Sequence, residues 1–533
     1  MTPETPSFHA HHSPIGALAS FTCGARDAKG GMGLELPGPY PGSISVGYHD
    51  ASGALHLLPL FQGSDSSESE RYVEGKSDNR GKRFVIPDVE REYLWATDRI
   101  ASPRVSMEIA TPFFPIPDPA TADPASLKFA CCPAVHLTLT FRNDSATPFR
   151  GIFALGIDHR WSSLAEQTGG SLTGATSQDR IGFATRTPGA KCFIDFDALS
   201  AMNRKHRSPE FLLGPTAGIE IEVPPGKTRA LEIALGFFRE GAATFNRRMS
   251  YYYTRHFTSL SQVLEYAIEN RSRYLEQASE RDLELAQSKL NDEQKFLVAH
   301  STRSYYGSTQ WLWDGTKSVW VVNEGEYLMM NTFDLSVDML FFEMRFNPWT
   351  VRNVLEQFVE RYSFYDKVFS PQDPDTLFEG GISFTHDMGV MNHWSPAGRS
   401  AYEVDGLDRA CFSHMTCEQL TNWILCASVY LAKTKDADFE RRYRGTFVEC
   451  FRSLQQRDHP DPEQRNGIMS FESSRTGGGE ITTYDSLDHS LGQARNNIYL
   501  GGKMWASYLA LEVRFRSSGQ SDLADEARSA AKL

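Results

Sequence analysis

The sequence predicts a β-sandwich followed by a helical toroid, because the spacing of its apolar residues changes near residue 242. Before that residue, short runs alternate apolar and polar residues with period two and are separated by Gly/Pro turns. After it, apolar residues recur at i, i+3 and i+4, as on one face of an α-helix. We therefore expect an α+β multidomain protein. A sandwich domain is expected over residues 1–241, a linker with helices over 242–290 and a helical domain over 291–533.

Three segments of the first half give the clearest strand patterns. Residues 135–141 and 219–223 alternate strictly between apolar and polar side chains. A Pro-Pro-Gly turn signal at 224–226 leads into a further apolar run over 230–237. Shorter strands are predicted near residues 43–48, 54–60 and 104–110. The polar stretch 63–82 has almost no apolar anchors and is predicted to be a mobile loop between strands.

Helix starts are marked by capping residues in the second half. Asn291 with Gln294 three residues later predicts a capped helix, and Pro348 after an Asn is a favourable first helical residue. Thr416 with Gln419 fits a capping box that leads into an apolar stripe. Residues 493–515 form another long helical stretch. In total we expect about eight helices between residues 258 and 533.

The composition excludes several classes of protein. The 54 Lys and Arg residues against 67 Asp and Glu residues give a net charge of −13, which repels nucleic acid and anionic membranes. The eight Cys include no CxxC pair, and the amino terminus carries no secretory signal, so we expect a cytoplasmic protein. We find no apolar run long enough to span a membrane and no phosphate loop, HExxH or GxSxG motif.

What remains is a set of segments rich in carboxylates, amides and aromatic rings, which is the composition that a sugar site needs. In the first segment an apolar run with Trp320 ends in the turn Asn323-Glu324-Gly325-Glu326-Tyr327. The alternative interpretation is a solvated turn, because Asn and Gly favour turns and Glu is usually exposed. Trp320 and Tyr327 weaken this alternative without excluding it, because a solvated turn does not need bulky aromatic residues on both sides.

Two further segments carry acidic residues. In one, Asp485 and Asp488 follow Tyr484, and the alternative interpretation is that Asp485 caps the next helix. In the other, His386 precedes Asp387. Such a neighbouring pair is more often part of a loop hydrogen-bond network than a catalytic dyad.

Many uncommon segments occur in one order along the chain, from about residue 9 to the last residues. They read HAHHSP, WVVNEGEY, MMNTFDLSVD, GGISFTHDMG, CFSHMT, RDHPDPEQRNG, EITTYDSLD and SLGQARNN. Together they resemble glycoside hydrolase family 52. The resemblance implies a β-xylosidase with a β-sandwich and an (α/α)6 barrel. It implies release of xylose from the non-reducing end of β-1,4-xylo-oligosaccharides with retention of configuration.

The resemblance also implies roles for individual residues. Glu324 would be the nucleophile and Asp485 the acid/base, with Glu326 and Asp488 as the runners-up. A retaining site needs two carboxyl groups about 5–5.5 Å apart, and no metal or cofactor is required. Asn323 or Arg495 would keep Glu324 ionised, and an apolar or anionic neighbourhood would keep Asp485 protonated. Residues expected to contact the sugar are Trp320, Asn323, Tyr327, Asn331, His386, Asp387, Arg495 and Asn496.

One departure from the family pattern concerns length. Twelve barrel helices at roughly 30 residues each need about 360 residues, but residues 258–533 number only 276. The last residues favour helix and lack a C-cap. We therefore expect a barrel without its last helices and with an open seam. A homodimer is one candidate assembly. The alternatives are an inactive sugar-binding or partner-dependent fragment, and a barrel enzyme of other sugar specificity or phosphorolytic chemistry.

Overall fold

The structure is a computed structural model of the whole chain. It describes residues 8–26, 28–36, 38–60, 83–203, 214–325, 327–404, 415–476, 479–483 and 492–533. The contacts divide the chain into two compact units. The first comprises residues 1–114, 122–241 and 250–313, and the second comprises residues 115–121, 242–249 and 314–533. The predicted domain limits at 241 and 291 stay a prediction, although the contacts group residues 250–313 with the first unit.

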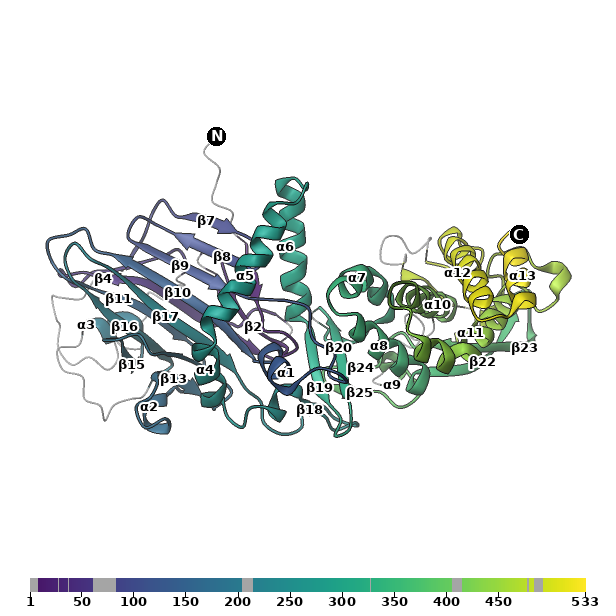
Figure 1. Cartoon of the computed structure of the whole chain (residues 1–533), viewed down its shortest axis with the longest axis horizontal. Coiled ribbons are helices and arrows are strands. Elements are labelled where there is room, and N and C mark those ends of the chain that lie inside the picture. Colours follow the sequence, from purple (N-terminus) through teal and green to yellow (C-terminus); the bar gives the residue numbers. More distant parts are fainter. Residues whose placement is uncertain are drawn as a thin grey trace. The chain divides into compact units, whose positions relative to one another are not determined.

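The first unit contains two large sheets (Figure 1). The eight-stranded sheet is antiparallel throughout and has the order β12 (Ser162–Ser163), β13 (Thr173–Ser177), β14 (Ile181–Thr185), β17 (Thr228–Phe237), β10 (Ala134–Arg142), β9 (Val105–Ala110), β8 (Thr97–Ala101) and β7 (Glu90–Tyr93). The six-stranded sheet has the order β15 (Lys191–Asp195), β16 (Thr216–Val223), β11 (Phe149–Gly156), β4 (Ser43–His49), β5 (Leu55–Leu57) and β6 (Arg83–Val85). These bounds confirm the strands predicted at 43–48, 104–110, 135–141, 219–223 and 230–237, and within 54–60.

The two sheets pack face to face, so the predicted sandwich is confirmed. The ring of Phe153 on β11 meets the ring of Phe183 on β14 edge to face, with centroids 5.4 Å apart. Gly151, two residues earlier on the same strand, lies under the ring of Phe141 on β10, where a Cβ atom would come within 2.6 Å of that ring. Alternate residues of β11 therefore enter the space between the sheets. Ile152 points to the opposite face of the six-stranded sheet, where it packs in an apolar cluster with Leu55 and Phe193.

Smaller elements complete the first unit. A three-stranded sheet is formed by β1 (Ala10–His12), β2 (Ala19–Cys23) and β3 (Gly31–Leu34), and β18 (Ser250–Tyr251) pairs with β19 (Thr309–Trp313). The helices are α1 (Pro124–Ala130), α2 (Leu164–Gln167), α3 (Ala198–Asn203), α4 (Leu260–Glu269), α5 (Arg271–Ala286) and α6 (Asp292–Gly307). Helices α4 and α5 lie against the eight-stranded sheet (Figure 1). The predicted cap of α6 is confirmed, because Asn291 and Gln294 form a full capping box.

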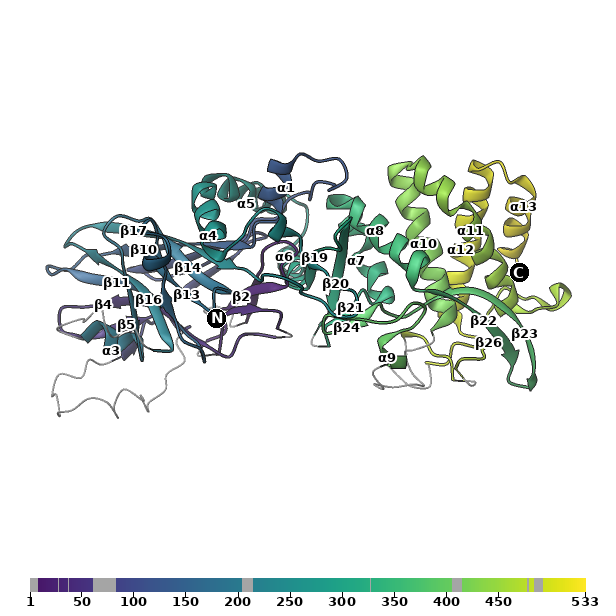
Figure 2. The ribbon, with the colours of Figure 1, turned by 90° about the horizontal axis from the view of Figure 1, so that it is seen from below.

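The second unit is mainly helical (Figure 2). Its helices are α7 (Phe333–Phe346), α8 (Pro348–Arg361), α9 (Ala401–Val404), α10 (Thr416–Thr434), α11 (Ala437–Asp458), α12 (Ile498–Ser517) and α13 (Ser521–Ala530). Its strands are β20 (Ser318–Glu324), β21 (Met329–Met330), β22 (Ser363–Ser370), β23 (Asp373–Phe384), β24 (Gly389–Val390), β25 (His393–Trp394) and β26 (Glu472–Ser473). Helix α10 packs against both α7 and α12, and the consecutive helices α7 and α8, α10 and α11, and α12 and α13 pack in pairs.

Several local predictions need correction. Helix α8 begins at Pro348 as expected, but α12 begins at Ile498, five residues after the predicted start at 493. Helix α13 ends at Ala530 instead of continuing to the last residue. The capping box predicted at Thr416 is wrong, because Thr416 lies inside α10 and its hydroxyl donates to the distant Glu480. The loop predicted at 63–82 lies outside the described residues, and none of the described helices has the length and apolarity needed to cross a membrane.

A buried ion pair fixes helix α11 within the second unit. Arg457 and Asp366 are both fully buried, with Nη2 and Oδ1 2.9 Å apart. Arg457 also donates to the hydroxyl of Thr416 at 3.2 Å and to the carbonyl of Gly380. One guanidinium therefore joins α11 to β22, β23 and the start of α10.

Replacing Arg457 with Met is expected to lower the free energy of unfolding by about 3–5 kcal/mol, because it leaves the Asp366 carboxylate buried without its cation. Arg441→Met on the same helix is the matched control. Its pair with Asp438 is exposed, so a loss below about 1 kcal/mol is expected. Urea denaturation of both variants measures the difference, and equal losses would contradict the structural role of Arg457.

Helix α12 carries an exposed apolar stripe. The exposed fractions of Ile498, Trp505, Leu509 and Val513 are 88%, 55%, 37% and 56%. Their spacings of seven, four and four residues place them on one helix face, while Tyr508 and other apolar residues of α12 are buried. An apolar face of this kind is the surface through which we expect self-association.

The double substitution Trp505→Lys and Val513→Lys is expected to shift the chain from associated species toward the monomer, because it places two charges in the stripe. Sedimentation velocity measures the shift at matched concentrations. Leu283→Lys on α5 is the control, since Leu283 is 56% exposed but belongs to the first unit. A wild-type chain that is already monomeric at all concentrations would contradict the prediction.

Candidate functional site

A tight hairpin presents Glu324 at the end of strand β20. Glu324 pairs in register with Met329 of β21, and Gly325 in the turn has a positive φ of 37°. Asn331 closes the hairpin, because its backbone N–H donates to the carbonyl of Val322 and its side-chain oxygen accepts from the N–H of Val322, both at 2.8 Å. Its φ of 52° is one that Asn tolerates better than most residues. Glu324 therefore lies at the end of strand β20, where the apolar run ends in a turn as the sequence predicts.

The amino-terminal turn of α7 faces this carboxylate. The hydroxyl of Thr332, the residue before α7, donates to Oε2 of Glu324 at 2.8 Å and makes no side-chain cap to its own helix. A helix amino terminus favours a nearby negative charge. The backbone N–H of Phe333 donates to the carbonyl of His386 at 2.8 Å, which joins the loop of His386 to the same turn.

His386 and Asp387 interact directly, although neighbouring residues often point apart. Nδ1 of His386 lies 3.1 Å from Oδ2 of Asp387, and Nε2 lies 3.6 Å from Oδ1 of Asp334. Burial alone would lower the pKa of His386, but Asp387, Asp334 and Glu324 raise it to about 9. Asp387 is fully buried and also accepts from the N–H groups of Gly389 and Ala401, so it organises the loop.

Asp334 is a further carboxyl group in this cluster. It is the second residue of α7, and its pKa is raised by burial and by the charges of Glu418 and Glu324, with His386 acting in the opposite direction. The charges of Glu324 and Glu418 thus both act on Asp334, although Glu418 lies on a different helix and far along the chain.

Glu418 connects helix α10 to the segment that precedes Asp485. It is fully buried and accepts hydrogen bonds from the N–H and hydroxyl of Thr483, both at 3.0 Å. The hydroxyl of Tyr499 and Nζ of Lys503, both from α12, lie 2.7 and 3.0 Å from Oε1 of Glu418. Because Lys503 balances its charge, Glu418 can hold Thr483 without leaving an unpaired buried carboxylate.

Glu480 anchors the same segment from its other side. Its carboxylate accepts from the hydroxyl of Thr416 at 2.8 Å, from the N–H of Cys417 at 2.9 Å and from the N–H of Ser473 at 3.1 Å. Burial raises the pKa of Glu480 to about 7, although Arg457 opposes the shift. Residues 481 and 493 form an isolated antiparallel bridge. The predicted acid/base Asp485 and the runners-up Asp488 and Glu326 lie outside the described residues.

The other predicted sugar contacts have different surroundings. Trp320 is fully buried and meets the Trp349 ring edge to face, so in this structure it has no surface for a sugar. Asn323 and Asn331 are also buried, and Asn331 supports the hairpin. Tyr327 is exposed at the turn. Arg495 donates to the buried Glu472 at 2.7 Å, and Asn496 follows it on the loop base with a φ of 50°. The roles of these residues stay a prediction.

Three residues of the site were missed by sequence reasoning. Asp334, Glu418 and Glu480 are each buried or nearly so, and each interacts with residues distant in the chain. The signal available for Glu418 was an acidic residue in the apolar stripe at the start of a helix. For Asp334, an acidic residue in a first turn is common in any helix and carries no specific signal.

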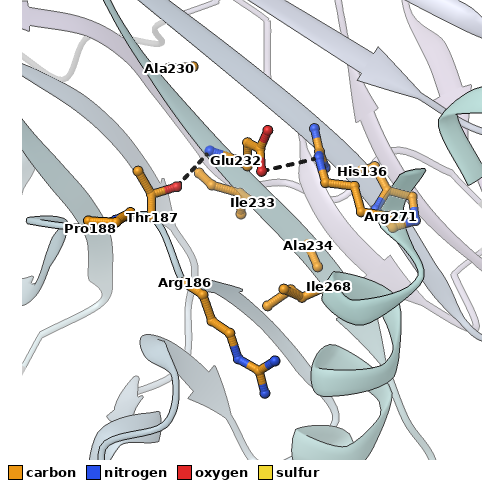
Figure 3. Close-up of a pocket in the computed structure, with 10 residues that line it drawn as sticks. All are labelled: His136, Arg186, Thr187, Pro188, Ala230, Glu232, Ile233, Ala234, Ile268 and Arg271. Atoms are coloured by element: carbon orange, nitrogen blue, oxygen red, sulfur yellow. Dashed lines mark hydrogen bonds and ion pairs between the residues drawn. The ribbon is translucent and has the colours of Figure 1, made fainter.

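A pocket of about 270 Å³ lies in the first unit, over β10 and β17 (Figure 3). It is lined by His136, Arg186, Thr187, Pro188, Ala230, Glu232, Ile233, Ala234, Ile268 and Arg271. Its single carboxylate, Glu232, lies 3.8 Å from Nε of Arg271. Since the described lining residues include no second carboxyl group, this pocket does not have the two carboxyl groups that a site for glycoside hydrolysis needs.

The charge of His386 makes the stability of the chain depend on pH. The pKa of His386 in the folded chain, about 9, lies above its ordinary value of 6.5. The protonated ring therefore contributes fully to the free energy of unfolding below pH 6.5. The contribution is lost as the pH rises through about 9, and a shift of this size corresponds to roughly 3 kcal/mol.

We therefore expect the free energy of unfolding of the wild-type chain to fall between pH 6.5 and about 9. The free energy of unfolding of His386→Gln should fall less over the same pH range. Urea denaturation at several pH values measures both. His459→Gln, at a partly exposed site, should keep the wild-type profile. Identical slopes for wild type and His386→Gln would contradict a protonated His386.

Comparisons with known proteins agree with the resemblance. The family described as Glycosyl hydrolase family 52 matches residues 21–430. Two relatives from Geobacillus stearothermophilus, both named Beta-xylosidase, are similar to this chain. One is 43% identical over 98% of this chain and 76% of its own length. The other is 37% identical over 97% of this chain and 86% of its own length.

A solved structure described as a putative kojibiose phosphorylase from human microbiome aligns over 98% of this chain and 67% of that chain at 10% identity. Its TM-score of 0.36 is too low to establish a shared fold. The chain belongs to glycosyl hydrolase family 52 and is a glycosidase.

Proposed function

We propose that this chain is a retaining exo-β-xylosidase that releases xylose from the non-reducing end of β-1,4-xylo-oligosaccharides. The observation that carries the proposal is the convergence of three helix starts on one group of carboxylates. Thr332 before α7 holds Glu324, Glu418 in the first turn of α10 holds Thr483, and Tyr499 and Lys503 of α12 hold Glu418. The relatives named Beta-xylosidase support the choice of substrate.

In this proposal Glu324 attacks the anomeric carbon while Asp485 protonates the leaving oxygen. The hydroxyl of Thr332, just before α7, donates to Oε2 of Glu324 and so orients the carboxylate that acts as the nucleophile. Glu418 and Glu480 anchor the segment before Asp485, and Lys503 balances the charge of Glu418. A general acid needs surroundings that raise its pKa, so the proposal requires an apolar or anionic neighbourhood around Asp485 itself. In the second step Asp485 removes a proton from water, which attacks the glycosyl-enzyme.

We further propose that the second unit is part of an (α/α)6 toroid in which α7, α10 and α12 form the inner row. The support is the packing of α10 against both α7 and α12, each followed in sequence by a helix that packs against it. The residues that hold the site come from the amino-terminal turns of the inner helices, so the site lies at one end of that row.

The proposed reaction is tested by following the product anomer. Incubation of the whole chain with an aryl β-xyloside, followed at once by proton NMR, should give β-xylose as the first product. An α-anomer first product would contradict retention. Release that requires inorganic phosphate would indicate a phosphorolytic reaction, and no turnover would favour the inactive sugar-binding fragment.

A further inference from the structure

The carboxyl group of Asp334 is nearly buried and lacks a hydrogen bond on one oxygen. Its side chain is 15% exposed, and Oδ1 has no donor among the residues that the structure describes. The nearest cation given for Oδ1, Nε2 of His386, lies 3.6 Å away, beyond hydrogen-bond distance. Burying a carboxyl oxygen without a donor is costly, so such an oxygen calls for a donor from outside the described residues, and a ligand is one source of it.

The position of Asp334 identifies the kind of ligand. It lies in the same turn of α7 as Thr332, whose hydroxyl holds Glu324, and the charges of Glu324 and Glu418 both act on it. A ligand that reaches Oδ1 of Asp334 is therefore next to the proposed nucleophile. Two carboxylates nearby disfavour an anionic ligand, whereas neutral hydroxyl groups donate readily to a carboxylate.

We propose that Asp334 is a substrate-binding residue whose Oδ1 accepts a hydrogen bond from a hydroxyl group of the sugar that Glu324 attacks. This inference rests on the proposed function, and it assigns to Asp334 a share of the selectivity for the sugar. A site that accepts a hydrogen bond from a substrate hydroxyl rejects an analogue that lacks the hydroxyl, because its own polar group is then left unpaired. The competing explanation is that Asp334 only stabilises the amino terminus of α7.

The test combines one protein change with changes in the substrate. Asp334→Ala and wild type are assayed with an aryl β-xyloside and with its 2-deoxy, 3-deoxy and 4-deoxy analogues. We expect Asp334→Ala to lower kcat/KM for the parent xyloside about 10- to 100-fold, because a hydrogen bond to a charged acceptor is lost. For the one analogue that lacks the bound hydroxyl, we expect the variant and wild type to differ less than about threefold. Asp338→Ala, an exposed residue four positions along α7, is the matched control and should match wild type on all four substrates.

A binding measurement separates this inference from the proposed reaction. Calorimetric titration with phenyl 1-thio-β-xyloside, whose thioglycosidic bond resists hydrolysis, should show weaker binding to Asp334→Ala than to Asp338→Ala by a similar factor. An equal loss on all four substrates, or unchanged binding of the thioxyloside, would overturn the role of Asp334 and leave the proposed function intact. A wild-type chain that neither cleaves the xyloside nor binds the thioxyloside would overturn both. Thermal melting checks the fold of each variant. Asp334→Ala removes a charge that helps to keep His386 protonated, so its kinetics and binding are compared below its own melting temperature.

Discussion

Replacing Glu324 with Ala should lower the turnover of aryl β-xylosides by roughly 10⁴- to 10⁶-fold, because it removes the group that forms the covalent intermediate. Thr332 and the hairpin of β20 and β21 would remain, so the loss should not come from unfolding. The Ala side chain leaves room for a small anion beside the anomeric carbon. Added azide should therefore restore turnover and give a xylosyl azide of inverted, α configuration, which NMR identifies.

Glu326→Ala is the matched control, since it removes a carboxyl group two residues further along the same turn. We expect this variant to keep most of its turnover and to form no azide product. The opposite pattern, with rescue in Glu326→Ala and none in Glu324→Ala, would transfer the nucleophilic role to Glu326.

Replacing Asp485 with Ala should affect substrates according to their leaving groups. For xylobiose, whose leaving oxygen needs a proton, kcat/KM of the variant should fall about 10²- to 10⁴-fold. For a dinitrophenyl β-xyloside, whose leaving group departs without protonation, kcat/KM should fall far less. The ratio of the two losses reports general acid catalysis, which a helix cap cannot provide.

Asp488→Ala serves as the comparison for Asp485→Ala, because it lies in the same segment. A uniform loss across both substrates for Asp485→Ala would make Asp485 a structural residue. A leaving-group dependence found in Asp488→Ala instead would assign the acid to Asp488.

The parts of the fold that the sequence predicts well depend on short-range patterns. Residues 135–141 of β10 and 219–223 of β16 alternate between apolar and polar side chains, β17 contains an apolar run, and the structure has all three strands within a few residues of the predicted limits. The cap of α6 is likewise local, since Asn291 and Gln294 satisfy each other's backbone groups.

The parts that the sequence does not predict depend on distant residues. Thr416 has the sequence of a capping box, yet Glu480, 64 residues away, accepts its hydroxyl and the next backbone N–H. The start of α12 also differs from its prediction, because Asn497 caps the helix and the pairing of residues 481 and 493 holds the preceding segment in a bridge. The cap at Asn497 is local, but the contact of Thr416 with Glu480 and the pairing of residues 481 and 493 lie outside any short window of neighbouring residues.

The candidate site shows the same division. Glu324 was assigned from a resemblance, and its hairpin was visible as an apolar run that ends in an Asn-Glu-Gly turn. Trp320 lies in that run and is expected to contact sugar, but β20 is buried from Ser318 to Asn323, and Trp320 lies in the core against Trp349. Asp334 and Glu418 look like ordinary acidic residues of helix starts, and only the packing of α7 against α10 brings them into one electrostatic cluster.

The central claim is that Glu324 forms a covalent bond to the sugar. The most direct test is to incubate the whole chain with dinitrophenyl 2-deoxy-2-fluoro-β-xyloside, whose fluorine slows the hydrolysis of the intermediate, and to map the labelled peptide by mass spectrometry. The account predicts one fluoroxylosyl group per chain, attached to the side chain of Glu324. A label on another carboxylate, or a fluorosugar that is hydrolysed with inversion and without any labelled peptide, would contradict it.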